Sequence, residues 1–210
     1  MKNILMTLVC AFCIQAIHAQ KIIEKHMNFA QKKSVILNIE IADSIRILTW
    51  NKNEVYIKAS VNVNENKNND DYKFTFDESG NNVDVSAKFD FKKMKKECNC
   101  NCETEIYADV YIPDNAGLSV ETINGNIIIS GNTAEVRAHT ISGFVDLTLS
   151  PSRKVDFKLN TISGTIYSNI AMNAGSGRSV STNISDQMNG GGKSIDLETI
   201  SGDIFFRKAE

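Results

Sequence analysis

The sequence predicts an all-β protein: a β-solenoid, that is, a stack of coils like a single-stranded β-helix, with an irregular β part before it. The 210-residue chain contains 25 Ile and 13 Val but only 9 Leu, and β-branched side chains fit strands better than helices. Apolar residues alternate by two along most of the chain, without a helical period. A four-residue motif also recurs in the second half. These observations disfavour a helical bundle and a Rossmann-type α/β enzyme.

Residues 1–19 have the pattern of a signal peptide. Lys2 precedes an apolar run, and Ala19 stands in the small-residue position before Gln20. We expect an exported protein, located in the periplasm, on the outer-membrane surface or outside the cell, with residues 20–210 as one mature domain. Its 23 basic and 25 acidic residues give a formal charge of -2, which offers no electrostatic footprint for nucleic acid.

Residues 20–117 are expected to form the irregular β part. Polar turns separate its alternating segments. Segments 72–76 and 83–91 lie on either side of a Gly-Asn-Asn turn, which predicts a hairpin. The predicted strands cover 35–49 in two pieces, 55–63, 72–76, 83–91 and 98–112.

Three cysteines lie at alternate positions in the last of these strands. Cys98, Cys100 and Cys102 share a face with Ile106, so we expect them to pack in the core or to form a local disulfide. A redox-labile thiol and a soft-metal site are the alternatives. The sequence predicts no cofactor and no metal.

Residues 118–206 are expected to form the repeat coils. Each copy of the motif reads as a corner between two short strands, so that stacked copies bury a common core and align Thr, Ile and Gly in ladders. We expect the motif isoleucines to point inward and the last position to need a left-handed backbone, which Asp also tolerates. The Thr and last positions are Thr122, Gly125, Thr140, Gly143, Thr161, Gly164, Asp186 (in a degenerate copy), Thr199 and Gly202.

These Thr-Ile-Ser-Gly-x-Ile/Val units resemble those of the bacterial putative-adhesin β-strand-repeat family, and residues 45–57 are also similar to its N-terminal part. The resemblance spans most of residues 35–206. It implies a secreted or cell-envelope β-solenoid without known catalytic residues.

A polar side chain precedes the motif Thr in each regular copy. These residues are Glu121, His139, Asn160 and Glu198. They predict a polar strip along one outer edge, for which a solvated wall is the favoured interpretation and the binding of a sugar or a cation is the alternative. The other acidic residues of the repeats are scattered, and no nucleophile lies beside a base, so we do not expect an enzyme.

The predicted function is that of an exported, non-catalytic adhesin or envelope binding module whose partner is an envelope protein or a glycan. The alternatives are a glycan-active or glycan-binding protein and an envelope-stress accessory protein. The coil around residues 204–206 is expected to leave an uncapped edge, which favours self-association through edge strands.

Overall fold

The computed structural model describes residues 20–90, 103–171 and 183–209. The predicted signal peptide and the three cysteines lie outside these residues. The described part is all-β, with one short 3-10 turn, η1 (Asn69–Asp71), and no described helix has the length and apolar character needed to cross a membrane. The strands are β1 (Lys21–Asn28), β2 (Ser34–Ile39), β3 (Ile41–Trp50), β4 (Glu54–Val63), β5 (Tyr72–Asp77), β6 (Asn82–Phe89), β7 (Thr104–Pro113), β8 (Gly117–Ser130), β9 (Val136–Ser142), β10 (Val145–Leu149), β11 (Val155–Ser163), β12 (Ile166–Ser168), β13 (Asn183–Met188), β14 (Lys193–Ser201) and β15 (Ile204–Lys208).

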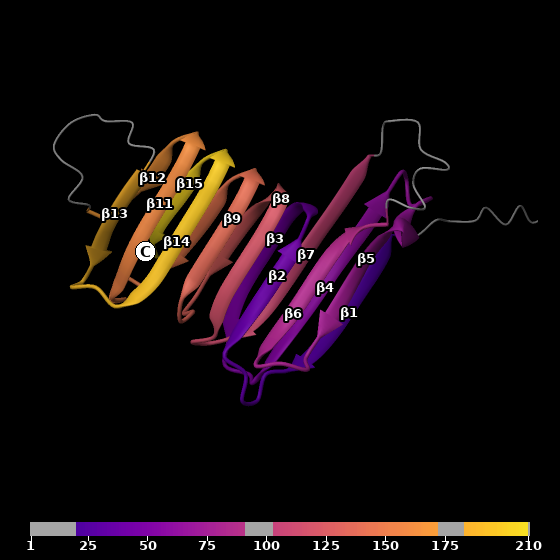
Figure 1. Ribbon diagram of the computed structural model, residues 1–210, viewed down its shortest axis with the longest axis horizontal. Helices are drawn as coiled ribbons and strands as arrows, with labels where there is room; N and C mark the ends of the chain where they lie inside the picture. Colours follow the sequence, from indigo (N-terminus) through magenta and orange to yellow (C-terminus); the bar gives the residue numbers. More distant parts are fainter. Residues whose placement is uncertain (1–19, 91–102, 172–182, 210) are drawn as a thin grey trace, which may run out of the picture.

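These strands form one large hydrogen-bonded sheet that bends into two layers (Figure 1). β8 shows the bend, because its first half pairs with β2 and its second half, from Asn124 onward, pairs with β3. The first layer runs β5-β6-β2-β8-β9-β14-β11-β13, and the second runs β1-β4-β7-β3-β8-β10-β15-β12. The layers face each other across a shared core, where the rings of Phe157 on β11 and Phe206 on β15 lie 4.7 Å apart.

The repeat copies stack as parallel strand-corner-strand units. β9 pairs in parallel with β8 and β14, and β14 also pairs in parallel with β11, with the motif threonines in register. The β2–β3 segment stacks on β8 in the same way, so one such unit lies within the N-terminal part.

The stack does not follow chain order, and the coil-after-coil winding expected of a solenoid is not what the structure shows. The last unit, β14–β15, lies between β9–β10 and β11–β12. β13, which carries the degenerate copy, pairs antiparallel with one edge of β11, and β14 occupies the other edge.

The core is built from alternate residues of both layers. Val120 before the corner of β8 and Ile127 after it are both fully buried. The motif Thr122 is buried as well, whereas Ile123 is 50% exposed. The expectation that the motif isoleucines face inward was therefore wrong. The alternation of buried and exposed residues shifts by one position only after the Ile, so the Ile side chain faces outward at the corner.

Two further expectations can be compared with the pairing. The predicted hairpin is confirmed, since β5 and β6 pair antiparallel. The predicted uncapped edge at residues 204–206 is wrong, because β15 lies between β10 and β12 and Phe206 is fully buried. β1 was not predicted, since most of its residues are exposed and alternation is weak; it pairs with β4.

Candidate functional site

The motif threonines hold the corners of neighbouring units together. Each buried hydroxyl donates a hydrogen bond to a backbone carbonyl oxygen of the next unit in the stack. A buried, satisfied hydroxyl of this kind stabilises the corner. The four bonds are Thr122 to Glu40 (3.3 Å), Thr140 to Gly125 (3.1 Å), Thr199 to Gly143 (3.0 Å) and Thr161 to Gly202 (2.9 Å).

The motif glycines are needed because the corner backbones approach each other closely. A Cβ on Gly143 would lie 2.2 Å from the carbonyl oxygen of Gly125, and one on Gly202 would lie 2.0 Å from that of Gly143. Gly125 and Gly164 would make similar clashes, with the carbonyl oxygens of Ala42 (2.4 Å) and Gly202 (1.8 Å) respectively. Only Gly143 and Gly202 also have the left-handed φ that was expected, +135° and +154°.

The degenerate copy makes no corner. Asp186 lies in the middle of the regular strand β13, and it is not among the described non-glycine residues with positive φ. The expectation of a left-handed Asp186 was therefore wrong. Since β13 runs antiparallel to β11 at the end of the first layer, it needs no turn at this point.

The corners expose a continuous row of isoleucines, which we call the isoleucine ridge. Each residue lies on a different strand of the first layer, and adjacent strands are about 4.8 Å apart, so the ridge is about 14 Å long. Sequence reasoning missed this feature because it placed these side chains in the core. In spatial order the ridge consists of Ile123 (50% exposed), Ile141 (42%), Ile200 (37%) and Ile162 (67%).

The predicted polar side chains do come together on the outer wall, directly beside the ridge. Their spatial order differs from their order in the chain, because β14 is inserted between β9 and β11, and Asn38 of β2 extends the row. Glu198 accepts a hydrogen bond from Asn160 (3.2 Å) and lies 3.7 Å from Nδ1 of His139. We call this row the polar strip: Asn38, Glu121, His139, Glu198 and Asn160.

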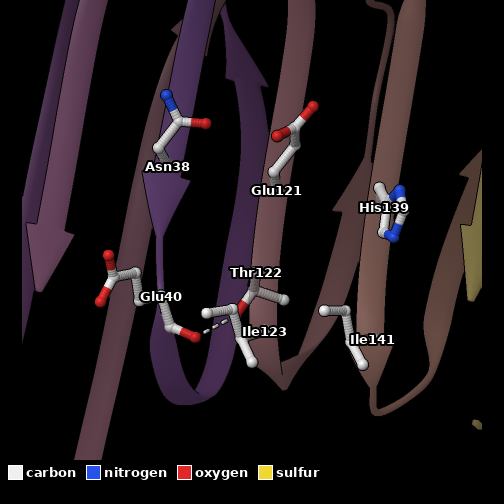
Figure 2. Close-up of a pocket in the computed structure, with 7 residues that line it drawn as sticks. All are labelled: Asn38, Glu40, Glu121, Thr122, Ile123, His139 and Ile141. Carbon is white, nitrogen blue, oxygen red and sulfur yellow. Dashed lines mark hydrogen bonds between the residues drawn. The ribbon is translucent and has the colours of Figure 1, made fainter. Parts of the chain in front are cut away.

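A cavity of about 300 Å³ lies where the strip and the ridge meet on β2, β8 and β9 (Figure 2). Figure 2 shows Ile123 and Ile141 side by side, with the carboxylate of Glu121 and the imidazole of His139 on the same side of the two isoleucines. Glu40, at the corner between β2 and β3, is a second acidic lining residue that sequence reasoning missed, and its carboxylate points away from Glu121 in Figure 2. The lining residues are Asn38, Glu40, Glu121, Thr122, Ile123, His139 and Ile141.

This surface places hydrogen-bond acceptors beside apolar side chains. Glu40 and Glu121 make no ion pair with any described residue, so both carboxylates are available to accept hydrogen bonds from a ligand. Within the described ranges, no group of three or more His, Cys, Asp or Glu residues is placed to hold a metal ion. The carboxylates of Glu121 and Glu198 come from strands on either side of β9, about 9.6 Å apart at their backbones.

No family model matches the chain, and no curated protein sequence matches it. Solved structures do resemble it. One is described as a putative cell adhesion protein from Clostridium sporogenes ATCC 15579, with 12% identity, a TM-score of 0.60, and coverage of 91% of this chain and 100% of the other. This likeness shows a shared fold.

Two weaker matches cover similar shares of the chains. One is described as a putative adhesin from Bacteroides fragilis NCTC 9343 (10% identity, TM-score 0.27, 91% and 99% covered). The other is described as a putative lipid binding protein from Parabacteroides distasonis ATCC 8503 (10% identity, TM-score 0.24, 90% and 97% covered).

Proposed function

We propose that this chain is an exported, non-catalytic binding module of the cell envelope, an adhesion-type protein that recognises its partner through the outer wall of the first layer. The observation that carries the proposal is the isoleucine ridge beside the polar strip. A contiguous apolar surface rimmed by polar groups is typical of an interaction site. The description of the Clostridium sporogenes structure as a putative cell adhesion protein is in line with the same role.

The ridge is difficult to explain by stability alone. The Thr and Gly of each motif already build the corner through a hydrogen bond and a close backbone contact. Neither the hydrogen bond nor the backbone contact constrains the exposed side chain between the Thr and the Gly, yet this side chain is Ile in all four regular copies. Outward positions in the neighbouring row are polar, as in Glu121, His139 and Glu198. A repeated apolar side chain at this place therefore supports a binding role.

Export and family membership belong to the same proposal. The leader-like residues 1–19 support secretion, and the motif resemblance to the putative-adhesin β-strand-repeat family supports a location in the envelope. The partner classes that fit are an envelope protein and a glycan, because the wall offers both apolar contacts and hydrogen-bond acceptors.

The test compares binding of residues 20–210 to envelope fractions of the source organism with that of a ridge variant. In the variant, the four ridge isoleucines become Ser. We expect most binding to be lost while the melting temperature changes little, because these side chains are already half exposed. The matched control is Ile22→Ser, an equally exposed isoleucine on β1 of the second layer. Equal loss in the control, or none in the ridge variant, would refute the proposal.

The second candidate function is a glycan-active protein. Its supporting observation is that Glu121 and Glu198 flank His139 in one row. Glycoside hydrolases use a pair of carboxyl groups that lie on either side of the bond to be cleaved. It predicts turnover on a polysaccharide panel that is abolished by Glu121→Gln and by Glu198→Gln. Binding without turnover would leave the non-catalytic proposal in place.

A further inference from the structure

We infer that the partner at this wall is a basic, amphipathic helix of another polypeptide. Its apolar side chains would lie on the isoleucine ridge, and a Lys or Arg would enter the cavity between Glu40 and Glu121. This inference rests on the proposed binding role and specifies its partner.

Charge complementarity selects a basic partner. Two acidic residues, Glu40 and Glu121, line the cavity, and Glu198 adds a third in the next part of the strip. Against them the cavity offers only His139, and neither Glu40 nor Glu121 has an ion-pair partner among the described residues. A cationic group on the partner gains attraction here, whereas an acidic partner meets repulsion.

The apolar part of the cavity fits the same kind of side chain. Lys and Arg carry long aliphatic stems that pack against apolar surface while the charged end reaches a polar group. Ile123 and Ile141 lie beside Glu121 in the same cavity. The stem would therefore contact the isoleucines while the cation reaches the carboxylates.

The spacing of the ridge favours a helix over an extended segment. Ridge residues are about 4.8 Å apart, the distance between neighbouring strands. A helix presents an apolar side chain once per turn of about 5.4 Å. Over the length of the ridge, its side chains are therefore displaced from the ridge isoleucines by less than about 2 Å. An extended segment presents same-face side chains about 6.7 Å apart, so its side chains are displaced from the ridge residues by about 6 Å at the end of the ridge. About ten helical residues span the ridge.

The test is a titration of isoleucine-methyl-labelled chain 20–210 with synthetic peptides, followed by NMR. The probe is a fourteen-residue Leu/Lys peptide with helical periodicity. Three control peptides accompany it: the same helical pattern with Gln or with Glu for Lys, and an isomer of identical composition in which Leu and Lys alternate strictly. Only the helical Leu/Lys peptide is expected to shift the methyl signals of the ridge with full affinity. The three controls should bind at least about tenfold more weakly, and added salt should weaken the Lys peptide.

Matched variants locate the site. Glu40→Gln with Glu121→Gln should weaken the Lys peptide at least about fivefold, and Ile141→Ser should weaken it as well. Glu135→Gln, on the same wall four residues before His139, and Ile22→Ser, on β1, should leave binding unchanged.

Equal affinity of the Lys and Gln peptides, stronger binding of the alternating isomer, or shifts confined to other methyl groups would overturn the inference. Ridge shifts caused by a neutral oligosaccharide in place of the Lys peptide would overturn it too. In those cases, loss of envelope binding in the ridge variant would still uphold the proposed function, so the two failures are distinguishable.

Discussion

At the scale of single residues, Gly143 has the most sharply defined requirement. Its φ is +135°, and a Cβ would lie 2.2 Å from the carbonyl oxygen of Gly125. We expect Gly143→Ala to lower the free energy of unfolding by at least about 2 kcal/mol, because backbone strain and a backbone clash add. Urea denaturation measures this change.

The matched control for Gly143 is Gly80→Ala. Nothing lies within 4 Å of a Cβ at Gly80, and its backbone is not in the left-handed region. This variant should keep the stability of the parent within about 0.5 kcal/mol. If both variants are equally stable, the close approach of the corners does not matter energetically.

Tyr72 is the residue whose ionisation is tied to folding. Its side chain is fully buried and its hydroxyl donates to the carbonyl oxygen of Ile41 (2.6 Å). Burial raises the pKa of Tyr72 above the ordinary tyrosine value. Because the folded-state pKa is the higher one, the stability from keeping this proton is complete below about pH 10 and is lost as the pH rises beyond it.

Alkaline titration followed by phenolate absorbance tests this. The chain has 5 tyrosines, and we expect Tyr72 to ionise only together with unfolding. Tyr72→Phe should remove that late phase. A Tyr72 that ionises near pH 10 in the folded protein would contradict the prediction.

At the scale of elements, Arg153 joins the loops at one end of two neighbouring units. It lies between β10 and β11, and its guanidinium donates to the carbonyl oxygens of Gly131 (3.4 Å), Thr133 and Ala134 (2.8 Å), in the loop between β8 and β9. Burial lowers the pKa of Arg153. These bonds hold the loop that leads into β9.

We expect Arg153→Met to lower the free energy of unfolding by about 2 kcal/mol, because hydrogen bonds from a charged donor are lost while the aliphatic stem is kept. Amide hydrogen exchange should speed up first in residues 131–135. Arg137→Met, a change at an exposed arginine of β9, serves as control and should have little effect. If amide exchange of residues 131–135 is no faster in Arg153→Met than in Arg137→Met, Arg153 does not hold the loop.

At the scale of the whole molecule, the structure specifies which units are neighbours in the stack. Ser142 and Ser201 are in register on adjacent strands, as are Ser163 and Ser201, whereas β14 separates Ser142 from Ser163. Neighbouring strands lie about 4.8 Å apart, within disulfide reach, and twice that distance is beyond it.

Paired cysteines test this order in residues 20–210 with Cys98, Cys100 and Cys102 replaced by Ser, so that no other cysteine is present. A pair at 142 and 201, or at 163 and 201, should oxidise to a cross-link, whereas a pair at 142 and 163 should not. The reverse result would mean that the units stack in chain order. Mass spectrometry after proteolysis identifies the bridge.

Much of the architecture was accessible from local pattern. Alternation by two located the hairpin of β5 and β6, and the motif spacing put Glu121, His139, Asn160 and Glu198 in one row. The exposed isoleucines were not accessible, because period-two alternation does not say on which side of a corner the phase changes. Glu40 was missed for a related reason: it belongs to a unit that lacks the motif.

The sequence by itself determined that the chain is all-β, that its copies align threonine with threonine, and that four corners carry glycine. The β content follows from the shape of β-branched side chains, and the alignment of threonines from their hydrogen bonds to carbonyl oxygens. The glycines are required because a carbonyl oxygen leaves no space for a Cβ at the corner. Only the tertiary structure decided which copies are neighbours and that the motif isoleucines face outward. The regular copies present the same Thr and Gly to one another, so local sequence fits several neighbours equally well. The pairing of β11 with β13 on one edge and with β14 on the other is visible only in the tertiary structure.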